Sequence, residues 1–447
     1  MEQPSFLEKE SKGDGVVKTS AEVIEWIHSL LPFGIKPGLK RMHWMLERLG
    51  NPENQLKAVH IGGTNGKGST LSFMRHVLQE AGYNVGTFTS PFIELFEERI
   101  SVNGTPIDEA SLVQCGSRVR PLVEELAKTE LGSPTEFEVI TTIAFDYFSN
   151  LSKPDIVLVE VGLGGRLDST NVISPMLSVI TSIGFDHMHI LGETLSHIAK
   201  EKAGIIKPNI PIISGVSQKK ARDIIAAKAN SVQADYFQIH VDFHERLLSV
   251  AANKQQFAYE SDCDLFDQVT IQMPGAHQRE NASVAIRALE WLRQKEMYFI
   301  SDEEIRRGLA ATTWIGRFEQ LSESPLVIID GAHNKEGMES LAQTLTQHYP
   351  SKRYRLLMAA TKEKDMNSLL KPFEQMNASF TFTTFDFFRA ADAKVLCEQA
   401  PVATKRYDTD WTNALRTEVN TLEEDSMLIV CGSLYFISAV RELWYSK

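Results

Sequence analysis

Cysteines are few in this chain, and none of them are closely paired. The 447 residues include four cysteines, and no two of these have C-x-x-C spacing. This usage is typical of reduced thiols in a cytosolic protein. No apolar run approaches the ~20 residues of a membrane span, and the N-terminal segment is charged and lacks the apolar region of a signal peptide. We therefore expect a cytoplasmic protein without a membrane partner.

Basic residues are also in the minority. Lysine and arginine number 46 against 58 aspartates and glutamates, which gives a net charge of −12. A general nucleic-acid binder would show a basic surplus, so this class of protein is excluded. An anionic substrate would need a local basic pocket instead. The chain is too long for one ordinary hydrophobic core, and we expect two or three domains.

The order of apolar segments predicts an α/β fold. Continuous apolar runs lie at residues 59–61, 85–89, 155–161, 177–181 and 210–214. Helical patterns lie between several of them, as in a mostly parallel sheet covered by helices on both faces. Residues 236–273 alternate in polarity and predict a small antiparallel edge. After residue 316 the α/β pattern restarts, which predicts a smaller, Rossmann-like C-terminal domain.

These patterns predict four segments along the chain. They are a polar leader at residues 1–20, a large domain at 21–312, a linker at 313–316 and a second domain at 317–447.

The most informative segment is a glycine-rich loop between an apolar strand and a helix. It consists of Gly63, Thr64, Asn65, Gly66, Lys67, Gly68, Ser69 and Thr70. Glycines let backbone N–H groups approach phosphate oxygens at a helix N-terminus. Lys67 adds a cation, and Ser69 or Thr70 offers a hydroxyl suited to Mg²⁺. Gly68 separates Lys67 from Ser69, unlike the common G-x-x-x-x-G-K-[ST] pattern. A tight turn is the alternative, but the flanking strand and helix favour nucleotide binding.

Polar residues follow other predicted strands at the same sheet edge, where α/β proteins bind ligands. Ser90 follows one strand, Glu160 ends an apolar strand, and His187 follows a third. A buried carboxylate is costly unless it is paired or binds a metal. A salt bridge at Glu160 and a structural role for His187 are the alternatives, but their common edge with the glycine-rich loop favours Mg²⁺ binding.

The second domain offers two further polar residues at a strand end. Asp330 follows an apolar run and His333 comes three residues later, where both suit contacts with a nucleotide. Asp330 could also be a helix N-cap. Arg317, in the joint between the domains, is placed to reach γ-phosphate oxygens, although an isolated arginine is more often a surface residue.

Eight motifs in order resemble the folylpolyglutamate synthase family, including its bacterial bifunctional dihydrofolate synthase form. They are GTNGKGS (63–69), TSP (89–91), EVGLGGRLD (160–168), DH (186–187), EKAGI (201–205), HQREN (277–281), GRFE (316–319) and DGAHN (330–334). The resemblance covers roughly residues 20–445. It also accounts for Gly68, because this family and the related Mur ligases use the G-T-x-G-K-[GT] loop.

The resemblance implies an ATP-binding domain with a folate pocket at 21–312 and a glutamate-ligase domain at 317–447. Lys67 and the loop amides would hold the ATP phosphates. The contacts implied for the rest of ATP come from Asn281, Arg317, Asp330 and His333. The implied cofactors are ATP and two Mg²⁺ ions, with a monovalent cation as a further candidate.

The same resemblance implies the metal ligands and the catalytic residues. Ser69, Ser90 and Glu160 would bind the first Mg²⁺, and His187 and Glu160 the second. Lys202 matches a lysine that the family carries as a carbamate, which would turn an ammonium into an anionic ligand. A plain helix-surface lysine is the alternative. The implied catalytic residues are Lys67, Lys202, His187 and Arg317.

The family's reaction begins with attack of a folate carboxylate on the γ-phosphate. The amine of L-glutamate then displaces phosphate from the acyl phosphate, inside closed domains that exclude water. For the pterin end, the resemblance points to Phe137 for stacking and Asp168 for the ring nitrogens, with a core position as the alternative for Phe137. The glutamate-binding residues are not identified from the sequence. The expected partners are folate or dihydropteroate, L-glutamate and ATP, bound by a monomer.

Three alternatives remain open at this point. The chain could be a folylpolyglutamate synthase only, without dihydropteroate as a substrate. A Mur-type muropeptide ligase would carry a further N-terminal nucleotide-binding domain, and only 58 residues precede the first apolar strand. A non-catalytic nucleotide switch would need none of Lys202, Arg317 and the Asp330–His333 pair.

Overall fold

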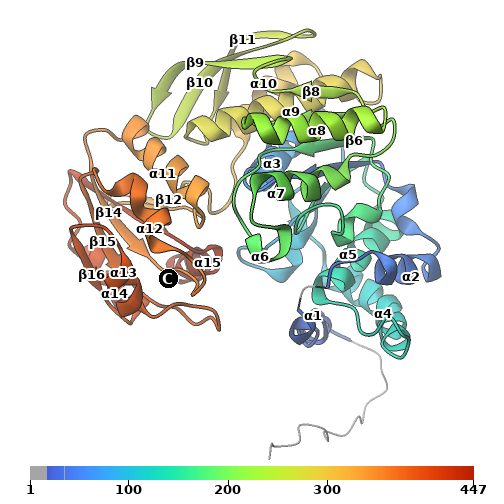
Figure 1. Ribbon diagram of the computed structural model, residues 1–447, viewed down its shortest axis with the longest axis horizontal. Coiled ribbons are helices and arrows are strands. Elements are labelled where there is room, and N and C mark those ends of the chain that lie inside the picture. Colours follow the sequence, from blue (N-terminus) through green and yellow to red (C-terminus); the bar gives the residue numbers. More distant parts are fainter. Residues whose placement is uncertain (1–17, 35, 447) are drawn as a thin grey trace, which may run out of the picture.

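The computed structural model describes residues 18–34 and 36–446. Residues 1–17 of the predicted leader lie outside the described residues, and the first helix, α1, begins at Ser20. The chain forms two α/β bodies side by side, one coloured blue to yellow and the other orange to red in Figure 1. The predicted fold class is confirmed, with a large parallel-rich sheet followed by a smaller α/β sheet.

The large sheet has eight strands in the order β4-β3-β2-β5-β1-β6-β7-β8. Its strands are β1 (Ala58–Gly62), β2 (Val85–Phe88), β3 (Ile100–Val102), β4 (Thr105–Pro106), β5 (Ile156–Glu160), β6 (Leu177–Ile180), β7 (Ile212–Ser214) and β8 (Tyr236–Gln238). All neighbours pair in parallel except at the β2–β3 and β3–β4 contacts. The carboxyl ends of the central strands therefore meet at one edge, as the sequence predicted.

Helices cover both faces of this sheet, because alternate side chains of its buried strands point to opposite sides. In β5, Ile156 and Leu158 pack toward α3, α9 and α10, whereas Val157 and Val159 pack toward α1, α2, α4 and α5. The helices of this body are α1 (Ser20–His28), α2 (Lys40–Arg48), α3 (Lys67–Glu80), α4 (Glu109–Leu126), α5 (Glu136–Asp146), α6 (Met188–Leu191), α7 (Leu195–Lys202), α8 (Lys219–Ser231), α9 (Ala276–Gln294) and α10 (Asp302–Ala311).

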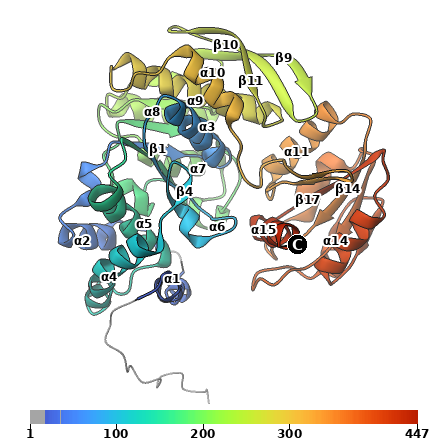
Figure 2. The same ribbon diagram turned by 180° about the vertical axis from the view of Figure 1, so that it is seen from behind.

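The segment at residues 236–273 does not form the antiparallel edge of the large sheet that the sequence predicted, but divides into two parts. Its first part, β8, pairs in parallel with β7. The remainder forms a separate three-stranded antiparallel sheet of β9 (Phe243–Ala251), β10 (Lys254–Ser261) and β11 (Leu265–Ile271). This sheet packs against α9 and shares its hydrophobic core, at the top of the molecule in Figure 2. Alternating polarity indicated the strands but not their partners.

The second body has six strands in the order β12-β13-β17-β14-β15-β16, parallel except at β12–β13. They are β12 (Glu319–Glu323), β13 (Leu326–Ile329), β14 (Arg353–Met358), β15 (Ala378–Phe382), β16 (Lys405–Tyr407) and β17 (Ser426–Cys431). Its helices are α11 (Lys335–His348), α12 (Met366–Leu370), α13 (Ala393–Gln399), α14 (Trp411–Asn420) and α15 (Leu434–Tyr445). Clusters of buried apolar side chains lie on both faces of the sheet.

We propose that the two domains meet at residues 313–316, between the end of α10 and the start of β12. Helix α10 begins with a capping box, in which Ser301 and Glu304 each bond the other's backbone N–H with their side chains. Among the described helices, none combines the length and apolar character that crossing a bilayer requires.

Candidate active site

The glycine-rich loop lies between β1 and α3, as the sequence predicted. α3 begins at Lys67, and Gly66 before it has a φ of 86°, in the left-handed region that favours glycine. A Cβ atom at Gly63 would lie 2.0 Å from the Thr181 hydroxyl oxygen, and one at Gly66 would lie 2.3 Å from Asn281 Oδ1. Glycine at both positions lets the loop pass close to the end of β6 and to α9.

Gly68 packs against an aromatic ring from the joint between the domains. A Cβ atom at Gly68 would lie 2.9 Å from three atoms of the Trp314 indole. The ring thus fills the space that a side chain would need. The extra glycine that distinguishes this loop therefore allows the first turn of α3 and the joint to approach closely.

Glu160 is a buried carboxylate beside the lysine of the loop. It ends β5 and is 5% exposed. Lys67 Nζ lies 3.8 Å from Glu160 Oε1 and donates hydrogen bonds to the carbonyls of Gly63 and Thr64 at 3.2 and 3.3 Å. Burial raises the pKa of Glu160, and the positive charge of Lys67 opposes this shift. The salt-bridge alternative for Glu160 therefore exists in the structure, at the same edge as the loop.

Two cavities meet at the loop and form one cleft between the domains. The smaller has a volume of about 230 Å³ and the larger about 440 Å³. The predicted site residues that line the smaller cavity are Asn65, Gly66, Ser69, Asn281, Arg317, Asp330 and His333. Those that line the larger one are Thr64, Asn65, Gly66, Lys67, Gly68, Ser90, Phe137, Glu160, Asp168, His187, Arg317 and His333.

Three predicted site residues line neither cavity. Gly63, the first residue of the loop, contributes to neither cavity. Thr70 is fully buried, and its hydroxyl has no hydrogen-bond partner. Of the two hydroxyls proposed for Mg²⁺, only that of Ser69 faces a cavity. Lys202, the last residue of α7, is 5% exposed, and its Nζ donates to the Gly63 carbonyl at 2.8 Å. Lys202 is therefore buried, and the helix-surface alternative is wrong. Burial lowers the pKa of Lys202 to about 7.

Asp330 holds a turn rather than capping a helix. Its carboxylate accepts hydrogen bonds from the backbone N–H groups of Phe318 and Ala332 at 2.9 and 2.8 Å. The N-cap of α11 is Asn334, whose Oδ1 accepts from the Gly337 N–H at 2.8 Å. The N-cap alternative for Asp330 is therefore wrong. The helix starts at Lys335, five residues after Asp330, because the strand is followed by a turn.

The two residues predicted for the pterin end both face the larger cavity. Phe137 packs against the loop after β5, where a Cβ atom at Gly162 would lie 2.5 Å from its ring. Asp168 is 5% exposed and accepts from the Leu163 N–H at 2.7 Å and from the Thr170 N–H at 3.0 Å. Burial raises the pKa of Asp168, and these hydrogen bonds counteract it.

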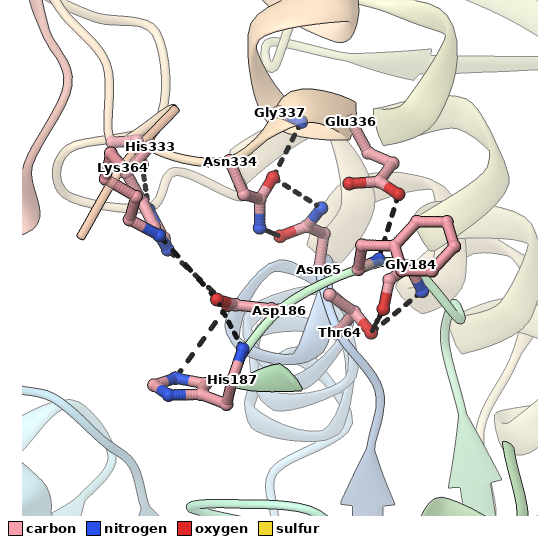
Figure 3. Close-up of polar contacts among 12 residues, drawn as sticks. Thr64, Asn65, Gly184, Asp186, His187, His333, Asn334, Glu336, Gly337 and Lys364 are labelled. Carbon is pink, nitrogen blue, oxygen red and sulfur yellow. Dashed lines mark hydrogen bonds and ion pairs between the residues drawn. The ribbon is translucent and has the colours of Figure 1, made fainter. Parts of the chain in front are cut away.

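Asp186, which was not among the predicted site residues, lies at the centre of a cluster of two histidines and one lysine (Figure 3). The oxygens of Asp186 lie 3.7 Å from Lys364 Nζ, 3.9 Å from His333 Nε2 and 3.8 Å from His187 Nε2. His187 and Asp186 belong to the first domain, and Lys364 and His333 to the second. Burial alone would raise the pKa of Asp186, but its hydrogen bond with His333 and the neighbouring His187 and Lys364 hold that pKa far below its usual range. The Asp186–His187 motif could have indicated the carboxylate, whereas nothing in the sequence indicated Lys364.

Two further polar contacts join the loop side of the cleft to the second domain (Figure 3). The amides of Asn65 and Asn334 donate to each other at 3.2 and 3.0 Å. Glu336 Oε1 accepts from the Phe185 N–H at 3.0 Å. The glycine-rich loop is therefore bonded directly to the first turn of α11.

Comparison with known proteins agrees with this geometry. Residues 61–289 match the Mur ligase middle domain, and residues 316–434 match the Mur ligase, glutamate ligase domain. The dihydrofolate synthase/folylpolyglutamate synthase of Bacillus subtilis is 44% identical over 93% of this chain and 97% of its own length. The chain belongs to the folylpolyglutamate synthase/dihydrofolate synthase family. The resemblance found in the motifs is thus confirmed, and family membership makes the chain an ATP-dependent ligase.

Solved structures of this family superpose over nearly the whole chain. Folylpolyglutamate synthase from Thermotoga maritima has a TM-score of 0.83 at 32% identity and covers 96% of this chain and 97% of its own. E. coli FolC in complex with DHPP and ADP has a TM-score of 0.87 at 26% identity and covers 97% of this chain and 99% of its own. The folylpolyglutamate synthase structures also include complexes with AMPPCP.

The contact between Gly68 and Trp314 leads to a first prediction. Substituting Gly68→Ala forces the indole away from the loop, so KM for ATP should rise about ten-fold, a cost typical of overpacking. Steady-state kinetics with varied ATP measures this effect. A second substitution, Trp314→Leu, removes the ring and should restore much of the ATP affinity. A Gly68→Ala variant with the wild-type KM for ATP would contradict this account.

Proposed function

We propose that this protein uses ATP to join L-glutamate to the carboxylate of a folate, and also to that of dihydropteroate. The observation that carries the proposal is the single cleft in which the glycine-rich loop lies between two cavities. The smaller cavity suits the nucleotide, and the larger suits a pterin with its aminobenzoate. The names of the family relatives, and the complexes of E. coli FolC with DHPP and ADP and of folylpolyglutamate synthase with AMPPCP and folate, support this assignment.

The reaction proceeds in two displacements. The acceptor carboxylate attacks the γ-phosphorus of ATP, so that ADP leaves and an acyl phosphate forms. The amine of glutamate then attacks the acyl carbon, phosphate leaves, and the amide nitrogen loses a proton. Lys67 and Arg317 line the cavity where the γ-phosphate would lie, and their charges neutralise the transferring phosphoryl group. Asn281, Asp330 and His333 face the nucleotide cavity and would contact ATP there.

The residues beside the loop fit Mg²⁺. Ser69, Ser90 and Glu160 offer hard oxygen donors, and when bound the ion neutralises phosphate charge. Among the described residues, no group of three or more His, Cys, Asp or Glu side chains gathers for a metal. This agrees with Mg²⁺ that binds few carboxylates and completes its shell with phosphate oxygens and water. A second Mg²⁺ would be held by Glu160, His187 and the carbamate of Lys202. The monovalent cation stays a prediction.

We further propose that the enzyme acts as a cytoplasmic monomer without nucleic-acid or membrane partners. The net charge of −12 supports the part of this proposal that concerns nucleic acid.

ADP release tests the proposed function. With Mg²⁺-ATP and glutamate present, ADP should form with dihydropteroate and with tetrahydrofolate, and only slowly without a pterin. A Lys67→Met variant should form little ADP under all three conditions, which would show that turnover comes from this site. Turnover with tetrahydrofolate alone would restrict the enzyme to polyglutamylation. Equal ATP hydrolysis in all three tubes, without glutamylated product, would contradict ligase activity.

The environment of Lys202 supports its modification by CO₂. Only the unprotonated amine reacts with CO₂, and burial lowers the pKa of Lys202 to about 7. With ¹³C-bicarbonate, a carbamate signal should therefore grow from about pH 6 to about pH 8, as the amine loses its proton. Lys202→Arg should remove the signal and lower kcat about 100-fold. Lys200→Ala, at an exposed position two residues earlier, is the matched control. A signal that persists in Lys202→Arg would assign the carbamate to another lysine.

We propose Arg389 as a carboxylate-binding residue for the incoming glutamate. It lines the larger cavity from the second domain. Two other basic residues on that wall, His333 and Lys364, already face Asp186. Among the described residues, Glu363 is the one carboxylate that pairs with Arg389, at 3.2 Å, and their side chains are 50% and 46% exposed. Such an exposed pair is weak, which leaves the guanidinium available to a carboxylate of the substrate.

Glutamate analogues can test this role. Arg389→Ala should raise KM for glutamate about 30-fold, as expected for losing a charge-assisted bond, with KM for ATP unchanged. The analogue γ-aminobutyrate lacks the α-carboxylate, and α-aminobutyrate lacks the γ-carboxylate. The variant should lose its preference for glutamate over one of these analogues only, which identifies the carboxylate that Arg389 binds. Glu363→Gln is the control for the local pair. An unchanged KM for glutamate in Arg389→Ala would rule out this role.

A further inference from the structure

The segment at residues 89–99 forms the rim of the larger cavity on the side of the first domain. Ser90 and Arg99 of this segment line the cavity. Its turn is closed internally, because the Glu98 carboxylate accepts from the backbone N–H groups of Ile93, Glu94 and Leu95 at 3.1, 3.2 and 3.0 Å. We call this segment the acceptor loop. The internal bonds fix the shape of its tip but not its distance from the second domain.

Helix α15 of the second domain contacts the tip of the acceptor loop. Arg441 forms an ion pair with Glu94, and the Ser438 hydroxyl donates to the Ile93 carbonyl. The side chain of Arg441 is 14% exposed, compared with 36% for Glu94. This is therefore a largely buried arginine, and its pairing is screened less than that of a surface ion pair.

Arg441 also reaches the joint between the domains. Its Nε donates to Glu319 Oε1 at 2.7 Å, and Glu319 Oε2 accepts from the Gly316 N–H at 2.8 Å. One guanidinium thus binds two carboxylates, one from the acceptor loop and one from the start of β12. Losing the arginine would leave two carboxylates close together without a shared cation.

The other end of α15 belongs to the cleft itself. Ser433, Leu434 and Tyr435, at the start of this helix, line the larger cavity. Because a helix moves as a rigid unit, the contact of Arg441 with the acceptor loop sets the distance between that loop and the cavity wall at Tyr435. The polar contacts around Asp186 and Asn65 join the domains beside the glycine-rich loop. Arg441 joins them on the acceptor side.

We propose that Arg441 is a positioning residue for the acceptor substrate. It holds the acceptor loop against the second domain, so that the rim around the pterin substrate is complete only when the domains are closed. The inference rests on the proposed function, because the acceptor is the folate or dihydropteroate of that reaction. It assigns Arg441 no contact with ATP or with the reacting atoms.

Variant kinetics test this role. Arg441→Met and Glu94→Gln should each raise KM for the pterin substrate about ten-fold, with KM for ATP within about two-fold of wild type. The double variant should show little further loss, because both changes remove one interaction. Arg441→Lys should recover part of the effect. Arg355→Met is the control, since Arg355 pairs with Glu418 within the second domain and lines neither cavity. It should lower stability without changing KM for the pterin.

A second measurement follows the loop directly. Glu94, Glu97 and Glu98 make the acceptor loop a substrate for a glutamate-specific protease. With AMPPCP and tetrahydrofolate bound, Arg441→Met should be cut there several times faster than wild type. Unchanged cleavage together with an unchanged KM for the pterin would overturn the inference. A wild-type enzyme that shows no pterin-dependent ADP release would instead contradict the proposed function.

Discussion

The cleft depends on one buried ion pair, between Lys67 at the start of α3 and Glu160 at the end of β5. The sheet brings the two residues together, because β1 pairs in parallel with β5 and both strands end at the same edge. A carboxylate that is 5% exposed needs a cation nearby to remain ionised, and a lysine beside phosphate oxygens needs an anion to hold it in place. Each residue therefore stabilises the charge of the other before any ligand binds. The lysine of the glycine-rich loop is thus held in place by a carboxylate of the first domain.

The second domain contributes to this site mainly through charges that cross the cleft. Asp186 belongs to the first domain, yet its carboxylate faces Lys364 and His333 of the second. The amide pair of Asn65 and Asn334 makes a similar connection from the glycine-rich loop itself. A movement of the loop therefore displaces the first turn of α11 through this hydrogen-bonded pair. This arrangement suits a reaction whose acyl phosphate must be kept from water, because the contacts that close the cleft are bonded to the phosphate site.

The sequence predicted the parts of the site that depend on strand order. Glu160, Ser90 and His187 were placed at one edge because they follow parallel strands, and the structure has them lining one cavity. Strand order could not predict the contacts between elements that lie far apart in the chain. The packing of Trp314 on Gly68, and the place of Lys364 beside Asp186, depend on how two separately folded sheets meet. No local pattern carries that information.

The sequence-based interpretations that the structure corrects concern local patterns that are compatible with two different structures. An acidic residue after a strand can cap a helix or hold a turn, and Asp330 holds the turn while Asn334 caps α11. Alternating polarity at residues 236–273 indicated strands, but a period of two does not specify a partner. The antiparallel sheet packs on α9 instead of extending the large sheet. A motif specifies residue types but does not show what each residue binds. The roles that the resemblance implies for the site residues therefore remain proposals.

The charge distribution explains how a chain with a net charge of −12 can hold polyanionic substrates. The larger cavity is lined by six lysines and arginines and by four carboxylates. Two of these carboxylates, Glu160 and Asp186, face cations of the same cleft. Because the acidic surplus lies elsewhere on the molecule, the field inside the cleft can attract phosphate and carboxylate groups even though the whole chain is acidic. The attraction of small anions to the cleft then depends on the position of the charges, not on their sum.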